Sequence, residues 1–418
     1  MKKKLFLPFI FLFSIFSFPL SSQEVKFSGE AGTVWAAALR SEKQGDFVLG
    51  DTYLNAKLDA FYEKSSAYVE GRVGFDEVSD KTYCNLREIW LDYTSDFWGI
   101  RIGRQKTAWG KADGIDITNV ICPRDYSTAR ALFNDEHKAI NAARFSLNKG
   151  NFSLDTYFIP FFTSSPLPEE KIMKLSSIIM PEKNLKSAEY GLKLSGYLPK
   201  CDLSLYGFYG FEDTPFLNYS PKIENDAQTG IDVTAEYKKM EMLGADAAIP
   251  LGETVLRLEA AFFPNRHFQK STDTIIKEKM LSLANGSSSE IENTLQRNEI
   301  SVLVGLDWMP EGWTFTAQYY GDYLFGSTEN LDRTKNYTHG ATLNVSKKLL
   351  QETLKLSASG IVHLNDLDSV IKLSAEYALS DSIYLEAGGY IFNEGKETGT
   401  YGEYKNLTSA YLKARYVF

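Results

Sequence analysis

The stretch LTSAYLKARYVF, residues 407–418, alternates apolar and polar side chains as a β-strand with two unlike faces would. One face carries Ala410, Leu412, Ala414, Tyr416 and Phe418, and the other carries Ser409, Tyr411, Lys413, Arg415 and Val417. Because successive side chains of a strand point to opposite sides, this segment separates an apolar surrounding from a mostly aqueous one. The alternation therefore predicts a strand whose two sides meet different solvents.

The composition favours an all-β protein rich in aromatic residues. The chain of 418 residues contains 24 Tyr, 27 Phe, 6 Trp and 30 Gly, but only 13 Pro and 4 His. Its net charge of −9 argues against nucleic acid as a partner, because a polyphosphate requires a basic surface.

The N-terminal segment predicts export. Lys2, Lys3 and Lys4 precede an apolar run from Leu5 to Leu20, which is shorter than the roughly 20 residues that span a bilayer. We expect residues 1–22 to be a cleaved signal peptide and residues 23–418 to form one domain. Beyond residue 23 the apolar residues are spread by alternation, which is also how a transmembrane barrel conceals its lipid-facing half.

Period-two alternation recurs along the chain, and the connections alternate in length. Short turns, such as Asn148-Lys149-Gly150 and Pro310-Glu311-Gly312, are separated by longer polar stretches, such as residues 107–136 and 265–296. A soluble two-sheet sandwich or a β-solenoid would also show alternating strands, but neither predicts alternating loop lengths. Tight turns at one end and long loops at the other are typical of outer-membrane barrels.

Counting strands under that constraint gives eighteen. The expected strands are residues 25–39, 51–62, 65–76, 85–94, 97–106, 137–147, 151–162, 187–198, 201–212, 231–250, 253–264, 297–309, 312–326, 337–348, 352–364, 367–378, 381–393 and 404–418. The tenth is long enough to hide a hairpin near Lys238-Lys239. The fold prediction is an all-β, antiparallel, up-and-down transmembrane β-barrel of about 18 strands (16–20) with an inserted third outer loop.

That third outer loop, residues 107–136, is too apolar to extend into water, and we expect it to fold into the lumen. Ile115, Ile117 and Ile121 would then pack on the inner wall. The expected pore-lining and constriction residues, from this loop and from inward-facing strand positions, are Arg72, Arg101, Gln105, Asp113, Asp116, Arg124, Asp125, Arg130, Arg257 and Glu259.

The same region carries a G-R-Q…W-G…N-x-x-x-P pattern. Its positions are Gly103, Arg104, Gln105, Trp109, Gly110, Asn119 and Pro123. This pattern resembles outer-membrane channels of the alginate-export-like group and related porin-type families of unknown function. The resemblance implies a channel, but the loop is less basic than an alginate conduit would be. By parity Arg104 shares the lipid-facing side of its strand, so it sits at the rim or a bulge near Gly103 turns it inward.

Few other chemical sites are expected. The sequence contains no G-x-S-x-G, H-E-x-x-H or Walker pattern, so we expect no enzymatic activity, no metal and no cofactor. Cys84 and Cys122 fall in the second and third outer loops, where a disulfide is an open alternative, and Cys201 is expected to be free. Residues 265–296 predict a short amphipathic helix over the barrel mouth or inside it.

The favoured function is an outer-membrane porin-like channel of a diderm bacterium, for passive diffusion of small polar solutes. The alternatives are a long-chain fatty-acid-type transporter for hydrophobic compounds and a surface-exposed non-transport barrel, such as an adhesin or antigen. The expected partners are outer-membrane lipid, the solute and, by resemblance to other barrels ending in an aromatic residue, the barrel-assembly machinery at Phe418. The oligomeric state stays open.

Overall fold

The computed structural model describes residues 24–40, 44–127, 137–167, 172, 175–224, 227–285, 291–396 and 399–418. The expected signal peptide and Arg130 lie outside these residues.

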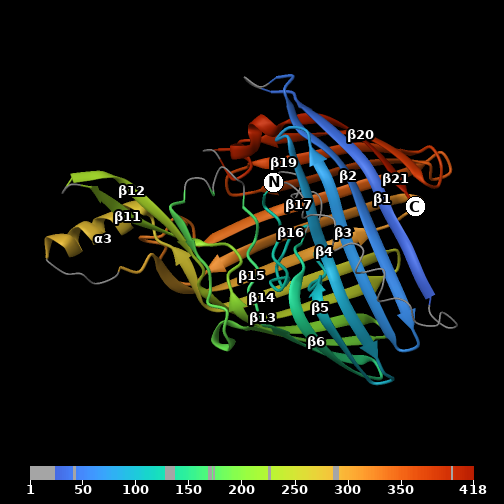
Figure 1. The fold of residues 1–418 in the computed structure, drawn as a ribbon, viewed down its shortest axis with the longest axis horizontal. Coiled ribbons are helices and arrows are strands. Elements are labelled where there is room, and N and C mark those ends of the chain that lie inside the picture. Colours follow the sequence, from blue (N-terminus) through green and yellow to red (C-terminus); the bar gives the residue numbers. More distant parts are fainter. Residues whose placement is uncertain are drawn as a thin grey trace, which may run out of the picture.

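Eighteen antiparallel strands form one closed barrel (Figure 1). They are β1 (Glu24–Ala38), β2 (Phe47–Tyr62), β3 (Ser65–Asp76), β4 (Lys81–Thr94), β5 (Trp98–Gln105), β6 (Ile140–Lys149), β7 (Phe152–Ile159), β9 (Glu189–Leu198), β10 (Cys201–Phe211), β13 (Lys239–Leu251), β14 (Thr254–Gln269), β15 (Thr294–Trp308), β16 (Trp313–Leu324), β17 (Tyr337–Leu349), β18 (Leu354–His363), β19 (Ser369–Ala378), β20 (Ile383–Asn393) and β21 (Ser409–Val417). Each pairs with its neighbour along the chain, and β21 pairs with β1. The barrel prediction is confirmed, with eighteen strands.

The two faces of each strand differ as the alternation requires. In β15, Val302, Val304 and Leu306 are exposed on the outside, whereas Ser301 and Asp307 are buried on the lumen side. Exposure of this apolar surface to water would be unfavourable, whereas contact with lipid hydrocarbon is not. The pairing of β1 with β21 closes the barrel, so no strand edge with unpaired backbone groups is left between them. The exterior is therefore a membrane-facing surface.

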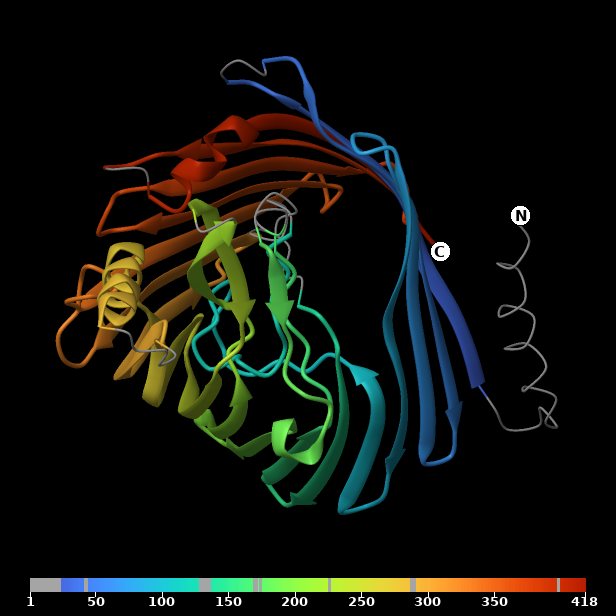
Figure 2. The same cartoon turned by 60° about the vertical axis from the view of Figure 1, so that its left-hand side comes forward.

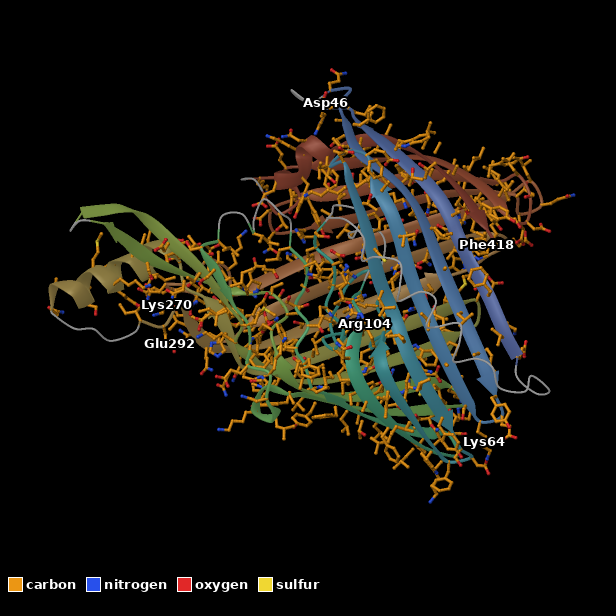
Figure 3. All side chains as sticks on the ribbon, in the orientation of Figure 1. Asp46, Lys64, Arg104, Lys270, Glu292 and Phe418 are labelled. Carbon is orange, nitrogen blue, oxygen red and sulfur yellow. The ribbon has the colours of Figure 1, made fainter. Side chains whose placement is uncertain are left out.

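The short turns gather at one end of the barrel, which we call the short-turn end, and the long connections gather at the other, the long-loop end. In Figure 3, Lys64 marks the short-turn end and Asp46 marks the long-loop end. Exposed aromatic side chains lie toward both ends of the barrel wall, among them Phe152, Tyr197 and Trp308 toward the short turns and Tyr190, Tyr323 and Tyr337 toward the long loops. Such belts are typical of membrane interfaces.

At the long-loop end three connections build a projection, which we call the outer arm (Figure 1). A three-stranded sheet joins β8 (Ser177–Ile179), β11 (Phe216–Glu224) and β12 (Ala227–Glu236), and helix α3 (Thr272–Ala284) packs against β11. Two short 3-10 helices, η3 (Leu185–Ser187) and η4 (Gly402–Leu407), complete the described helices. No helix among the described residues is long and apolar enough to cross a membrane.

The outer arm corrects two expectations. The predicted strand 231–250 is two elements, because the chain leaves β12 at Glu236 and enters the barrel wall only at Lys239. The break is at Tyr237-Lys238, next to the Lys238-Lys239 position at which the sequence left a hairpin open, but β12 and β13 belong to different sheets and do not pair with each other. The helix expected within 265–296 is present, but it lies in the outer arm and not inside the barrel (Figure 2).

Candidate channel and constriction

The chain between β5 and β6 enters the barrel. Figure 2 shows its cyan segment crossing the ring of strands. We call its described part, residues 106–127, the insert. The side chains of Trp109, Ile117, Ile121 and Cys122 are almost fully buried. They form one apolar cluster with wall residues Ile140, Ala142, Tyr157, Ile159, Tyr206, Phe208, Met240, Met242, Ala261, Phe263 and Leu303. The insert thus covers the lumen face of strands β6 to β15.

The wall makes room for the insert with glycines. A Cβ atom on Gly191 would lie 3.2 Å from the ring of Trp109 and 3.2 Å from Ile121. A Cβ atom on Gly244 would lie 3.0 Å from the methyl group of Thr118. Because both approaches are closer than ordinary van der Waals contact, a larger side chain at either position would push the insert away from the wall.

Two charged side chains of β14 hold the tip of the insert. The Glu259 carboxylate, 4% exposed, accepts the backbone N–H groups of Lys111 and Ala112 and the Thr118 hydroxyl at 3.2 Å. Arg257 donates to the Lys111 carbonyl at 2.6 Å and to Asp307 at 2.6 Å. Both residues were expected to line the pore. Glu259 anchors the insert instead, because the insert backbone covers it, whereas Arg257 anchors the insert with 32% of its side-chain surface still exposed.

The motif residues shape the insert. Gly110 has φ +85°, and its N–H donates to the Tyr206 hydroxyl at 3.0 Å. A Cβ atom there would lie 2.7 Å from Glu259 Oε1. The Trp109 ring packs against the Tyr206 ring in a tilted arrangement with centroids 5.0 Å apart, and the Trp109 backbone N–H donates to Asn119 Oδ1 at 3.2 Å. The sequence pattern therefore encodes how the insert is held.

An ionic cluster closes the neck of the insert. Asp116 pairs with Arg124 at 2.9 Å and lies 3.1 Å from His137 Nε2, while Lys138 pairs with Asp125 at 2.5 Å. Burial opposes the charged form of Asp125, but Lys138 and Ser127 hold the pKa of its carboxyl below the ordinary value. Asp116 and Arg124, expected at the constriction, are thus engaged mainly within the insert.

The Lys138 backbone N–H also donates to the Pro123 carbonyl at 2.7 Å. This contact fixes the last motif position next to the start of β6. The whole motif region therefore lies on the path from β5 back to β6.

The first three motif residues end β5. Gln105 is fully buried, and its side-chain amide donates to the Ala142 carbonyl at 2.9 Å, so it does not face a passage. Arg104 pairs in register with Ile89 of β4, whose side chain is exposed on the outside. No register shift interrupts the β4–β5 or β5–β6 ladders, so Arg104 sits at the rim and no bulge turns it inward.

Arg101 takes a third position, on the lumen wall below the rim. It lies over the Trp90 ring at 3.7 Å and 3.6 Å from Asp92. The cation–π contact and the ion pair both hold this guanidinium on the wall. Arg101 is therefore not brought together with the insert residues.

The tip of the insert faces the opposite wall across a cavity of about 290 Å³, which we call cavity 2. Asp113 and Gly114 line one side. The other side is a group of hydroxyl and amide side chains on β16 to β19: Thr316, Thr342, Asn344, Ser346, Ser357, Ser359 and Ser374. Lys372 and Glu386, 3.7 Å apart, border it. Of the expected constriction residues, Asp113 alone lies at this gap.

The set of hydroxyl and amide side chains that lines cavity 2 was not predicted from the sequence. Its signal was present, since Thr342, Asn344 and Ser346 alternate along β17 and Ser357 and Ser359 alternate along β18. These positions are small and uncharged, so alternation alone does not distinguish them from other inward-facing positions. Their role depends on which strands stand opposite the insert, and alternation alone does not report that.

A second cavity, of about 460 Å³, lies beside the rim, and we call it cavity 1. It is lined by Arg72, Arg104 and Asp125 of the expected residues, together with Lys106 and Lys138. Arg72 donates to Asp51 at 2.8 Å and lies over the Tyr53 ring at 3.8 Å. Of the expected residues, cavity 1 therefore takes three and cavity 2 takes only Asp113, while the others line neither cavity or lie outside the described residues.

The disulfide left open by the sequence is not formed, because all three cysteines are free. Cys84 belongs to β4 and is exposed, not part of an outer loop. Cys122 is buried in the insert, 3.3 Å from the Thr107 N–H. Among the residues that the structure describes, no group of three or more His, Cys, Asp or Glu could hold a metal ion.

The fold is similar to solved outer-membrane channels at low sequence identity. OccAB3 of Acinetobacter baumannii has a TM-score of 0.53 and 10% identity, with 96% of this chain and 100% of that chain covered. OccK5 (OpdH) of Pseudomonas aeruginosa has a TM-score of 0.53 and 8% identity, covering 96% and 98%. OccK2 (OpdF) of the same species, solved with glucuronate, has a TM-score of 0.52 and 9% identity, covering 96% and 98%.

These likenesses confirm the barrel architecture of outer-membrane channels. No curated protein is similar enough in sequence to match this chain. The profile of the family described as "Protein of unknown function (DUF1302)" matches residues 19–402. This agrees with the expected resemblance to barrel families of unknown function, while the alginate-export-like assignment stays a prediction. Since the match spans most of the sequence, the chain belongs to the DUF1302 family.

Proposed function

We propose that this protein is an outer-membrane channel of a diderm bacterium, through which small polar solutes diffuse passively. The insert sets the narrowest part of the passage. The observation that carries the proposal is the position of the insert tip, which is anchored to β14 and faces cavity 2.

The width of the barrel supports this proposal. Eighteen strands enclose a lumen wider than side chains alone can fill. The insert covers one side of the wall, from β6 to β15, and leaves the hydroxyl-rich wall of β16 to β19 facing the interior. A polar gap between a fixed loop and a fixed wall suits a solute that exchanges water for hydroxyl contacts.

The chemistry of the cavities favours polar solutes over the fatty-acid alternative. A transporter of long-chain hydrocarbons needs an apolar binding surface. Cavity 1 and cavity 2 are both lined mainly by charged, hydroxyl and amide side chains. OccK2, which shares the fold, was solved with glucuronate, a small polar solute.

The test is conductance in planar bilayers with the insert released. Glu259→Ala removes the acceptor of two backbone N–H groups and a hydroxyl, each worth about 1.5–3 kcal/mol as a charge-assisted hydrogen bond. We expect wild-type protein to give ohmic steps, and the variant to give larger and noisier ones.

Glu70→Ala is the matched control. Glu70 is also a buried lumen-side carboxylate, and among the described residues its contacts are with Asn55 at 3.0 Å, Tyr68 at 2.9 Å and Arg87 at 3.6 Å, none of which belongs to the insert. Its step size should stay near that of the wild type. If folded wild-type protein passes no current, or if both variants change conductance equally, the proposed constriction is wrong.

A further inference from the structure

Cavity 1 lies at a notch in the barrel wall. Strand β4 pairs with β5 only from Ile89 to Thr94, so its half nearer the long-loop end extends beyond the last residue of β5. Side chains from both faces of β4 reach the cavity. Tyr83 donates to lumen-side Asp51 at 2.7 Å, whereas Leu86 is exposed on the other face. The cavity therefore sits where the lumen, the rim and the outer surface meet.

Positive charge exceeds negative charge around this cavity. Among its lining residues, Arg72, Arg87, Arg104, Lys106 and Lys138 are basic and Asp51, Asp76 and Asp125 are acidic. Each of these carboxylates already has partners. Asp51 accepts from Arg72, Asp125 accepts from Lys138, and Asp76 accepts the backbone N–H of Val78 at 2.9 Å. The lining carboxylates are therefore fewer than the lining cations, and each of them is already engaged by a residue other than Arg104.

The unmatched charge centres on Arg104. Its Nε atom is buried and has no hydrogen-bond partner, and no ion pair joins its guanidinium to any of the described residues. Figure 3 labels Arg104 on the barrel body, well away from the Lys64 turn. By contrast, Arg72 is bonded to Asp51, and Arg87 lies 3.6 Å from Glu70. A guanidinium that is partly buried without a partner is costly unless a ligand satisfies its donors.

The preceding glycine explains how Arg104 comes to this place. Gly103 has φ +138°, and a Cβ atom there would lie 2.3 Å from the Ile89 carbonyl and 2.7 Å from Trp90 Cα. Only glycine lets β5 approach β4 this closely just before β5 ends. The G-R pair of the motif thus places a guanidinium at the notch, next to the unpaired part of β4.

We propose that cavity 1 is an oxyanion-binding site, with Arg104 as its main ligand-binding residue. The planar guanidinium matches two oxygens of a carboxylate or a phosphate, and the surrounding cations add to the attraction. Because the notch opens toward both the lumen and the outer surface, the oxyanion comes either from a soluble solute or from a lipid headgroup. The binding group is the same in both cases.

Binding by purified, folded barrel in detergent tests the site. The probes for isothermal calorimetry are inorganic phosphate, glucuronate and dihexanoyl phosphatidic acid, with glucose as the uncharged match for glucuronate. We expect the wild type to bind at least one oxyanion and not glucose. Arg104→Gln should weaken that binding by about fivefold or more, and Arg104→Lys should weaken it less, since a charged hydrogen bond is lost in one case and partly kept in the other.

Arg415→Gln is the control for lumen charge in general. Arg415 is paired with Glu376 at 2.8 Å and Glu30 at 3.3 Å, so its loss removes one positive charge without opening a free guanidinium site. Binding by this variant should equal that of the wild type. Folding of each variant is checked by heat-dependent gel mobility.

The outcomes separate the alternatives. Tighter binding of phosphatidic acid than of phosphate identifies a lipid headgroup, and equal or weaker binding identifies a soluble anion. If the folded wild type binds none of the three oxyanions, or if Arg104→Gln and Arg415→Gln behave alike, the site does not exist. This result is independent of channel activity, because conductance in potassium chloride is measured separately and does not require Arg104.

Discussion

At the scale of single residues, Gly110 has the most demanding position in the insert. Its backbone is left-handed, and the space that a side chain would need is occupied by the Glu259 carboxylate. Gly114, four residues later, also has a positive φ of +77°, but nothing lies within 4 Å of the place where its Cβ would be. Substitution of Gly114 would therefore introduce backbone strain alone, whereas substitution of Gly110 would introduce both backbone strain and a steric clash.

We predict that Gly110→Ala releases the insert and Gly114→Ala does not. A left-handed alanine costs about 1–2 kcal/mol in both variants. In Gly110→Ala the methyl group also displaces Glu259 from the backbone N–H groups that it accepts. Single-channel recordings should show a larger, noisier conductance only for Gly110→Ala. Equal conductance changes in the two variants would mean that strain alone governs the insert.

At the scale of elements, the insert behaves as an extra layer of the inner wall. Cys122 reports on its packing, because its thiol is 2% exposed among residues of the apolar cluster. Burial raises the pKa of this thiol to about 12, so at neutral pH it is both inaccessible and protonated. Exposure of Cys122 to a water-soluble reagent therefore requires the insert to leave the wall.

We predict slow maleimide labelling of Cys122 in a chain in which Cys84 and Cys201 are replaced by serine. Adding Glu259→Ala should raise the labelling rate by at least about tenfold, because the thiol then meets water and its pKa falls toward the ordinary value of about 8.5. The same chain with Glu70→Ala keeps the slow rate. Fast labelling of the chain without further substitution would contradict the docked position of the insert.

The outer arm is the element that local sequence signals described least well. Helical spacing predicted α3 correctly, since Ile275, Ile276 and Met280 recur on one side of the segment. Its location depends on a long-range contact, in which Lys279 donates to Asn218 and Ser220 of β11 at 2.7 and 2.9 Å. The polar residues 213–230, which hold β11 and the start of β12, likewise predicted a loop, but β11 and β12 pair as a hairpin.

At the scale of the whole molecule, the apolar exterior of the barrel determines that the protein resides in a membrane. Rows of exposed leucine, valine and aromatic side chains run around the closed barrel, while carboxylates, hydroxyls and guanidinium groups face inward. An apolar belt this extensive exceeds the patches that soluble monomers expose. Hydrogen bonds between Gly29 and Phe418, at 2.9 and 3.1 Å, help to join the first and last strands.

We predict that the mature chain requires detergent to remain monomeric and shows β-type circular dichroism. Unheated samples should migrate faster on gels than boiled ones, because a closed barrel resists unfolding by the detergent of the gel. A chain that stays monomeric in buffer alone, or one with a mainly helical spectrum, would rule out the membrane barrel. Recognition of Phe418 by the assembly machinery remains a separate prediction, measurable as reduced assembly of Phe418→Ala in cells.

The sequence by itself determined the number of barrel strands, the two faces of each and the inward course of the third loop. These are local properties, since a period of two and an apolar loop can be read within one segment. Only the tertiary structure decided what the insert contacts, because Glu259 lies 148 residues from Lys111 and nothing between them encodes their meeting. The same reason explains why Arg257 and Glu259 became anchors, why Arg104 lies at a notch, and why small hydroxyl residues face the insert. Each of these roles is set by strands that the barrel places opposite one another, and not by neighbours along the chain.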